Sequence, residues 1–263
     1  RRRLVTWYTH GRVTWKTRTV AWLSDVVLTA SPGSFRVNSS KVLVTGHGID
    51  LEAFTPQPRQ PDGCFRIVSV GRISPTKDYA TVIQAVARLR QSGVAGVRCE
   101  IVGGPGLPQH QQYFDRLRAM TERLGLADVV RFVGPVANRR VAAYYQRADV
   151  MVHMSGTGSL DKAGLEAMAC GLPVVTSNAA FRSLVPTDLQ ELENDATGLA
   201  DALRRVLGWD APERRALGQR LRRAVARDHG LPALARTIVA ACRGRAARPA
   251  RRNREARARR GRA

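Results

Sequence analysis

Short apolar runs occur along the whole chain, and their spacing changes once. Three runs of strand length come first, at residues 4–8, 26–30 and 41–45. Residues 56–63 follow, with the sequence Pro-Gln-Pro-Arg-Gln-Pro-Asp-Gly. Prolines and glycine at this density interrupt helices and strands alike, so the segment predicts a linker between two parts of the chain.

After residue 63 the pattern becomes a regular alternation. Strands are expected at 66–70, 98–102, 129–133, 150–154 and 174–176, and amphipathic helices between them at 79–91, 111–124, 139–147 and 162–169. In the first helix Val82, Ile83, Val86 and Leu89 recur at helical spacing, and Gly93 marks its end. Apolar strands separated by helices indicate βαβ units. The expected fold class is therefore α/β, with a parallel sheet flanked by helices on both faces.

The last part of the chain predicts helices and then a tail. Helices are expected at 201–208, 212–225 and 232–242. Residues 243–263 contain ten Arg and one Glu among few apolar residues. Such a segment cannot bury enough apolar surface to fold, so a disordered basic tail is expected there.

Charge is the unusual feature of the composition. The 263 residues include 43 Lys and Arg against 21 Asp and Glu, a formal net charge of +22, and the only lysines are Lys16, Lys41, Lys77 and Lys162. A strongly basic protein is attracted to nucleic acid, anionic membrane surfaces or phosphorylated small molecules. With 44% apolar and 24% charged residues, a mostly disordered chain, a collagen-like fibre and a disulfide miniprotein are excluded.

Cysteine spacing and the start of the chain bear on its location. Cys64, Cys99, Cys170 and Cys242 are far apart, which is typical of free thiols in a reducing compartment. No stretch approaches ~18 uninterrupted apolar residues, so no transmembrane helix is expected. The basic start lacks the apolar core of a signal peptide. Because the sequence has no initiator Met, we expect a fragment of a longer protein.

Small residues follow all five expected strands of the second part. They lie at 71–72, 103–106, 134–136, 155–161 and 177–178. Ligands of open parallel sheets bind at the carboxyl ends of the strands, where small residues let backbone amides approach them. Tight turns after strands also require glycine, so this pattern alone leaves both interpretations open.

The first of these loops contains two cations. Gly71 and Arg72 follow the strand, and Lys77 precedes the helix. The planar guanidinium of Arg72 and the ammonium of Lys77 are suited to binding a diphosphate. Arginine is abundant in this chain, so Lys77 is the more informative of the two.

A second candidate site runs from Thr157 to Val175. Asp161 is a good N-cap, and the free amides of that helix start can hold a phosphate. Glu166 lies one turn into the helix, where a carboxylate can accept hydrogen bonds from the two hydroxyls of a ribose. The alternatives are a solvated helical Glu at 166 and a plain N-cap at 161.

These two sites together resemble a known family. Gly71-Arg72, Lys77 and the run Leu165-Glu166-Ala167-Met168-Ala169-Cys170-Gly171-Leu172-Pro173-Val174-Val175 are similar to the nucleotide-sugar domain of family 4 glycosyltransferases. Members of that family are retaining enzymes of the GT-B fold that need no metal. The similarity covers residues 42–242. Asp228-His229-Gly230-Leu231 resembles a subgroup of bacterial members.

The resemblance implies a fold and a domain organisation. The segments 7–11 and 46–54 resemble the end of the family's N-terminal domain. The expected architecture is the C-terminal half of a GT-B fold, a Rossmann-like parallel sheet flanked by helices, with an incomplete second Rossmann-like domain. Its parts would be an acceptor-domain remnant, a linker, a donor domain and a basic tail, at residues 1–55, 56–63, 64–242 and 243–263.

The resemblance also implies residue roles. Gly71, Arg72 and Lys77 would bind the donor diphosphate, and Glu166 would bind the ribose. Val136 would contact the base through its backbone. His10 would reach the donor from the opposite domain. His47 and His153 are interpreted as structural.

One position departs from the family pattern. The family usually has a Glu eight residues before Glu166, at the donor sugar, and this chain has Gly158 there. It offers Ser159, Asp161 and Lys162 instead. Ser159 is expected to help bind the donor, and Asp161 or Lys162 to take over the contact with the sugar.

The residues and the resemblance together predict an enzyme. It would transfer a sugar, with retention, from a nucleotide-diphosphate sugar to a hydroxyl acceptor, lipid-linked or not, in the synthesis of a glycan, glycolipid or cell-envelope polysaccharide. No cofactor, metal or nucleic-acid partner is expected. The expected location is the cytoplasm. Peripheral contact with the inner face of an anionic membrane stays open. The fragment itself is expected to be weakly active or inactive.

Two alternative functions stay open. One is a sugar-nucleotide 2-epimerase of the GT-B fold, which would be expected to show paired catalytic carboxylates and histidines. The other is a non-catalytic basic protein that binds nucleic acid or a membrane surface. The +22 charge favours this second alternative, whereas the scattering of the arginines is against it.

Overall fold

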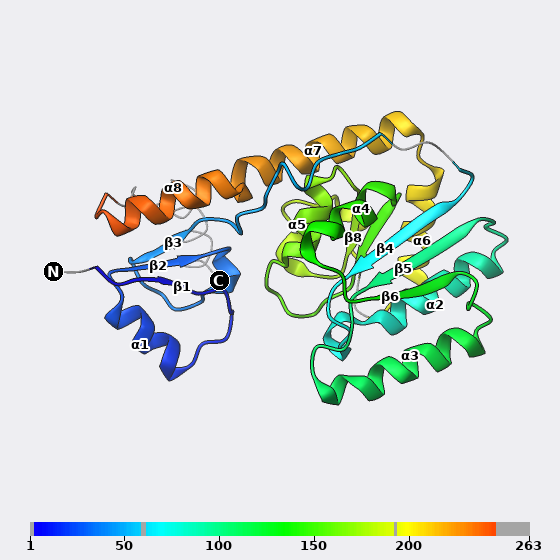
Figure 1. Ribbon diagram of the computed structural model, residues 1–263, viewed down its shortest axis with the longest axis horizontal. Helices are drawn as coiled ribbons and strands as arrows, with labels where there is room; N and C mark the ends of the chain where they lie inside the picture. Colours follow the sequence, from blue (N-terminus) through cyan, green and yellow to red (C-terminus); the bar gives the residue numbers. More distant parts are fainter. Residues whose placement is uncertain (1–2, 59–61, 192–193, 246–263) are drawn as a thin grey trace. The chain divides into compact units, whose positions relative to one another are not determined.

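A computed structural model describes residues 3–58, 62–191 and 194–245 (Figure 1). Its contacts divide the chain into two compact units. Unit 1 consists of Arg1–Gly48 together with Asp228–Ala263, and unit 2 consists of Ile49–Arg227. The expected linker therefore lies within unit 2, and its residues 59–61 are outside the described ranges, as is the expected tail from residue 246 onward.

Both junctions differ from the expected domain boundaries. Residues 228–242 belong to unit 1, where Ala241 packs against Val26 and Leu28. The sequence assigns these residues to the larger domain because they follow its helices along the chain. An apolar helical pattern indicates that a helix is buried, but not which core it enters.

The other difference concerns residues 49–55, which belong to unit 2 rather than to the N-terminal part. Ile49 and Phe54 are buried in the core of unit 2. Arg222 fixes the segment by donating hydrogen bonds to the carbonyl oxygens of Leu51, at 3.1 Å, and Phe54, at 2.8 Å. These bonds satisfy backbone groups that burial would otherwise leave unpaired.

Unit 1 contains a parallel sheet of three strands in the order β1-β2-β3. The strands are β1 (Val5–Trp7), β2 (Val26–Thr29) and β3 (Val42–Val44), so the three expected strands are confirmed. Two helices complete the unit, α1 (Trp15–Leu23) and α8 (Leu231–Cys242). The pattern of α1 does not predict a helix, because only Thr17 and Ala21 are buried. A capping box between Thr14 and Thr17 fixes its start.

Unit 2 contains a parallel sheet of five strands in the order β6-β5-β4-β7-β8 (Figure 1). The strands are β4 (Phe65–Val70), β5 (Val97–Val102), β6 (Val130–Gly134), β7 (Val150–His153) and β8 (Val174–Thr176). All four pairings are parallel. The five strands expected after the linker and the α/β fold class are therefore confirmed.

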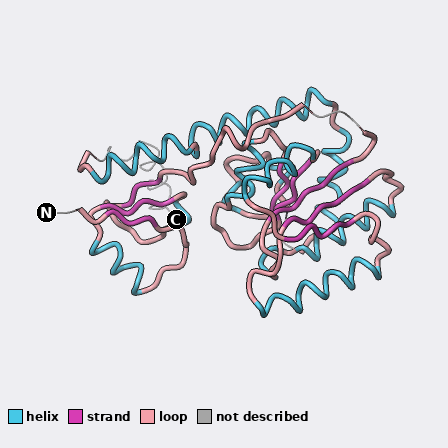
Figure 2. The backbone as a smooth tube through the Cα atoms, in the orientation of Figure 1, coloured by secondary structure: helices cyan, strands magenta, loops and turns pink. Residues whose placement is uncertain are grey.

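Helices connect the five strands of unit 2, and two further α-helices follow the last strand (Figure 2). They are α2 (Tyr79–Gln91), α3 (Gln111–Arg123), α4 (Asn138–Arg147), α5 (Lys162–Ala169), α6 (Ala196–Gly208) and α7 (Ala211–His229). Right-handed crossovers place α2 and α3 on one face of the sheet and α4 and α5 on the other. The packing agrees, since α2 contacts α3 and α6, while α4 contacts α5.

The helix α2 illustrates how local sequence fixes these elements. Val82, Ile83, Val86 and Leu89 are fully buried, and burial of each stabilises the fold by about 1.5–3 kcal/mol. The side chain of Asp78 caps the start by accepting from the Thr81 amide. Other ends shift from expectation: α6 begins at Ala196, five residues early, because Asp195 accepts from the Gly198 amide.

Within the described ranges, no helix is both long enough and apolar enough to cross a bilayer.

Candidate functional site

The sheet of unit 2 has one topological switch point. From β4 the chain moves outward through β5 to β6, and then returns to the other side of β4 for β7 and β8. The loops after β4 and β7 therefore lead to helices on opposite faces and leave a crevice between them at the carboxyl edge. The loops concerned are 71–78 and 154–161, which carry the candidate residues found in the sequence.

Glycines let the loops after β4 and β5 approach each other. A Cβ atom on Gly103, whose φ is +141°, would lie 1.9 Å from the carbonyl oxygen of Gly71, so only glycine fits there. The Arg72 side chain lies against Gly106, where an added Cβ would be 2.7 Å from the Arg72 Cδ atom. Arg72 is exposed.

Lys77 and Asp161 meet across the switch point. The Lys77 ammonium lies 2.5 Å from Asp161 Oδ2 and 3.5 Å from Ser155 Oγ. The same Asp161 oxygen lies 2.8 Å from Nε2 of His153, a histidine only 2% exposed. One carboxylate oxygen thus joins the loop after β4 to the last residue of β7.

The charges in this cluster compensate one another. Burial raises the pKa of the Asp161 carboxyl, but the hydrogen bonds and charges of His153 and Lys77 outweigh it and hold that pKa well below its usual range. Burial lowers the pKa of the His153 imidazole, which Asp161 offsets only in part. The surroundings therefore favour an ionised Asp161 carboxylate and a neutral His153 imidazole.

Asp161 occupies the N-cap position of α5 without capping it. Its backbone is extended there, and its side chain makes no capping hydrogen bond. The plain N-cap interpretation is therefore wrong for this side chain, which is held by Lys77 and His153 instead. The amides of the first turn of α5 have no side-chain cap from this residue, and such amides attract anions.

Glu166 is buried rather than solvated. It is 7% exposed, and its Oε1 accepts a hydrogen bond of 3.2 Å from the Asn138 amide at the start of α4. Burial raises the pKa of this carboxyl, which the Asn138 hydrogen bond and the Lys162 charge offset only in part. The solvated alternative is therefore wrong. A buried carboxylate with acceptor capacity left is a functional-site feature.

The other predicted residues lie at the same edge or in unit 1. Val136 is half-buried after β6, and Lys162 is exposed at the start of α5. The carbonyl oxygen of Ser159 accepts from the side-chain amide of Asn178 at 2.8 Å. His10 is exposed in unit 1, where its Nδ1 accepts from the Arg12 backbone at 3.2 Å.

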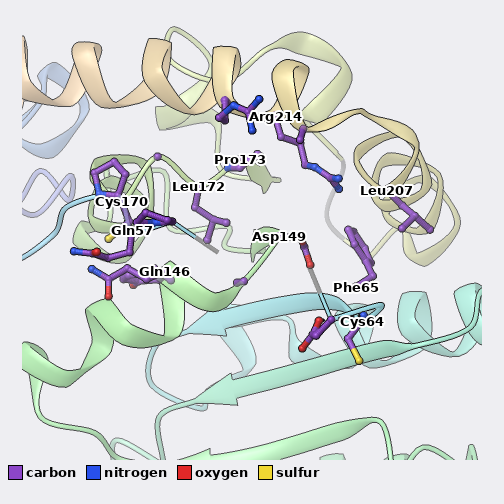
Figure 3. Close-up of a pocket in the computed structure, with 18 of the residues that line it drawn as sticks. Gln57, Cys64, Phe65, Gln146, Asp149, Cys170, Leu172, Pro173, Leu207 and Arg214 are labelled. Atoms are coloured by element: carbon purple, nitrogen blue, oxygen red, sulfur yellow. Dashed lines mark hydrogen bonds between the residues drawn. The ribbon is translucent and has the colours of Figure 1, made fainter. Parts of the chain in front are cut away.

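Figure 3 shows a cavity at the opposite edge of the sheet. It has a volume of about 850 Å³, and its walls include Phe65, Asp149 and Pro173, which lie at the amino ends of β4, β7 and β8. Lys77, Asp161 and Glu166 are not among its lining residues. The described ranges contain no group of three His, Cys, Asp or Glu side chains able to hold a metal ion.

Residues 52–223 match the family model described as glycosyl transferases group 1. This segment contains the whole five-stranded sheet and its carboxyl edge. The chain belongs to the glycosyl transferases group 1 family. The Rossmann-like sheet of unit 2 is accordingly one half of a GT-B glycosyltransferase fold, as the motifs around Lys77 and Glu166 predict.

Several curated members of this family are similar in sequence. The chain is 35% identical over 217 residues to D-inositol 3-phosphate glycosyltransferase of Actinosynnema mirum, which covers 77% of this chain and 50% of that protein. It is 32% identical over 211 residues to the putative colanic acid biosynthesis glycosyltransferase WcaL of Escherichia coli, covering 76% and 50%. The chain spans about half the length of these relatives.

Solved structures share the fold. Anabaena Alr3699/HepE in complex with UDP superposes with a TM-score of 0.78 at 18% identity, over 92% of this chain and 72% of that one. The complex of the same protein with UDP-glucose gives a TM-score of 0.77, also at 18% identity, over 92% and 72%.

Sequence reasoning does not identify two side chains as partners of the candidate residues. Asn138 is an unremarkable helix-start residue until the fold places it against Glu166. His153, which the sequence indicates as structural, contacts the carboxylate that also contacts Lys77. A polar residue in an otherwise apolar strand, Val150–His153, is the one signal that could have indicated it.

Proposed function

We propose that this chain is the donor-binding part of a retaining glycosyltransferase, which moves a sugar from a nucleotide-diphosphate sugar to a hydroxyl acceptor. The observation that carries the proposal is the grouping of Lys77, the start of α5 and the buried Glu166 at the switch point of a group 1 sheet. An anion-binding start of a helix beside a carboxylate suits a molecule that combines a diphosphate with a ribose.

Each residue has a role in this proposal. Lys77 and Arg72 bind the diphosphate, with Gly71 allowing close approach of the backbone. Glu166 accepts hydrogen bonds from the ribose hydroxyls, and Asn138 orients it. Val136 contacts the base through its backbone, and Ser159 helps to hold the donor.

The sugar end of the donor falls to the residues that replace the family's first Glu. Asp161 or Lys162 contacts the sugar, and His10 reaches the donor from the N-terminal part of the protein. Cationic side chains and the amides of α5 stabilise the leaving diphosphate electrostatically. Retention of configuration and membership of family 4 rest on the resemblance of the motifs. No metal or cofactor is proposed.

The acceptor and location are proposed from the relatives and the surface. Colanic acid synthesis, named for the Escherichia coli relative, favours a bacterial cell-envelope glycan as the product. Free thiols at all four cysteines favour the cytoplasm. Trp15 and Trp22 are exposed on α1, and the Lys16 ammonium lies over the Trp15 ring. These side chains favour peripheral contact with an anionic membrane.

Calorimetric titration with a panel of UDP- and GDP-sugars tests the proposal. We expect saturable binding of at least one nucleotide sugar, weakened by Lys77→Met and by Glu166→Gln and unaffected by Lys16→Met. Absence of binding across the panel, or binding that survives both site variants, would contradict it. A basic nucleic-acid binder would instead bind DNA with an affinity that falls steeply with salt.

A further inference from the structure

The hydrogen bonds around His153 differ between its two protonation states. Its Nε2 faces Asp161 Oδ2 at 2.8 Å, and its Nδ1 faces the Thr176 hydroxyl at 3.1 Å. The Thr176 hydroxyl is also 2.8 Å from the carbonyl oxygen of His153, toward which it donates. The backbone amide of Asn178 donates to the same hydroxyl oxygen at 3.0 Å.

In the neutral state the one hydroxyl proton of Thr176 has two possible acceptors, Nδ1 and the carbonyl oxygen of His153. If the imidazole is neutral, Nε2–H donates to Asp161, and Nδ1 needs the Thr176 hydroxyl as its donor. If the imidazole is protonated, Nδ1–H donates to the Thr176 oxygen, and the hydroxyl turns to the His153 carbonyl. Both states leave the two ring nitrogens satisfied, so rotation of one hydroxyl allows His153 to exist in either.

The charges that decide between the two states are few. Within the described ranges, the groups that act electrostatically on the ring are Asp161, which favours the imidazolium, and Lys77, which opposes it. The ring also packs against Phe181, with centroids 5.3 Å apart, which keeps it dry. The buried Tyr79 phenol donates to the carbonyl oxygen of Gly71 at 3.1 Å, and burial raises its pKa above the physiological range, so it stays uncharged.

We infer that His153 takes up one proton from solvent when a diphosphate engages Lys77. Burial is the main cause of the lowered pKa of His153, and the Lys77 charge adds to it. A diphosphate adds negative charge beside Asp161 and takes a share of the Lys77 ammonium, so this second contribution weakens. The step converts a neutral imidazole into an imidazolium with no other bond broken or formed. The identity of the ligand rests on the proposed function, whereas the opposition of Lys77 and His153 does not.

The consequence is a positioning role for His153 in donor binding. Once protonated, it holds the Asp161 carboxylate in place while Lys77 turns to the diphosphate. It also places a positive charge behind the carboxylate, which reduces repulsion between Asp161 and the ligand. Donor affinity should therefore rise as the pH falls through the pKa of His153 in the complex, by roughly tenfold per pH unit, until the pKa of the free site is reached.

The first test needs no ligand. The pKa of His153 is measured by imidazole NMR in the full chain and in Lys77→Met, with the signal assigned from His153→Gln. We expect the pKa to rise in Lys77→Met, because a charge that opposes the imidazolium is removed. Lys162→Met, which removes a neighbouring exposed ammonium, is the matched control and should shift it by less than half as much. An unchanged pKa in Lys77→Met would overturn the inference.

The second test measures the proton directly. UDP-glucose, whose diphosphate diester does not titrate near neutral pH, is titrated calorimetrically in two buffers of different ionisation enthalpy. We expect uptake of up to one proton per ligand in the natural chain and none in His153→Gln. Binding whose heat is independent of the buffer at every pH of a series that starts at the pKa of the free His153 would refute the inference while leaving the proposed function intact. Absence of binding would count against UDP-glucose as donor, and the NMR result would still decide the inference.

Discussion

One carboxylate lies just before α5 and another in its second turn, and their surroundings have opposite effects on them. Asp161, just before the helix, is held by an ammonium and an imidazole, and its pKa is depressed. Glu166, in the second turn, receives one hydrogen bond from an amide, and its pKa is raised by burial. The first carboxylate is compensated within the chain, whereas the second is left with acceptor capacity.

This difference separates a structural cost from a structural gain. A carboxyl with a depressed pKa stabilises the fold above the pKa it has when unfolded, and one with a raised pKa costs stability at neutral pH. The charged Glu166 carboxylate therefore lowers the stability of the protein when no ligand is bound. A ligand that donates to the carboxylate, such as a ribose diol, would remove that cost on binding.

The largest expected effect is that of Lys77→Met, which removes the cation that compensates the Asp161 carboxylate. We expect the affinity for the nucleotide sugar that binds in the panel to fall about 100-fold. Charged hydrogen bonds to a diphosphate contribute roughly 1.5–3 kcal/mol each. Calorimetric titration measures the loss, with Lys16→Met on α1 as a charge-matched control. A loss below threefold would mean that Lys77 serves only to neutralise Asp161.

Next in size is the effect of Asp161→Asn on folding. We expect the free energy of unfolding at pH 7 to fall by about 1–3 kcal/mol, because the hydrogen bonds of Lys77 and His153 lose a charged acceptor. The stabilisation is present above the ordinary value of 3.8 and lost below it, so the difference between variant and natural chain should shrink as the pH falls under about 4. Urea denaturation at several pH values measures this, and a pH-independent difference would contradict it.

For the uncompensated carboxylate, Glu166→Gln should change ligand affinity and folding stability in different directions. We expect nucleotide affinity to fall about tenfold, since the amide replaces one acceptor by a donor that faces a hydroxyl. The free energy of unfolding at pH 7 should stay equal or rise, because the burial cost of the charge is removed. Glu122→Gln, on an exposed position of α3, is the control for both measurements. A fall in stability would show that Glu166 is compensated after all.

The smallest effect is expected from Lys162→Met, between the two carboxylates in sequence. Lys162 is exposed, and exposed charge interactions contribute about 0–1 kcal/mol. Affinity for the free nucleoside diphosphate should change by less than about threefold. A larger loss confined to the intact donor would identify Lys162, rather than Asp161, as the contact with the sugar.

Much of the fold was predictable from local patterns. The strands of both sheets and the helix α2 follow from apolar periodicity and from caps such as Gly93, all of which are local properties. The helix α1 was not predictable, because it buries only two side chains. The grouping of residues 228–242 with unit 1 depends on packing between segments about 200 residues apart, which no local pattern contains.

The site was predictable in its positions and not in its pairings. Lys77, Asp161 and Glu166 follow from loops at strand ends and from the motif after them. The hydrogen bond between Lys77 and Asp161 joins residues 84 positions apart. The hydrogen bond between Asn138 and Glu166 joins residues 28 positions apart. Sequence spacing sets which side chains are candidates, and the fold sets which partners they find.

One measurement tests the central assignment most directly, by comparing a nucleoside diphosphate with its nucleoside. UDP and uridine, or the pair with the base selected in the panel, are titrated into the natural chain, Lys77→Met and Glu166→Gln. If Lys77 binds the diphosphate and Glu166 the ribose, Lys77→Met weakens the diphosphate far more than the nucleoside, and Glu166→Gln weakens both by a similar factor. Equal weakening of both ligands by Lys77→Met, or unchanged nucleoside binding in Glu166→Gln, would contradict the account.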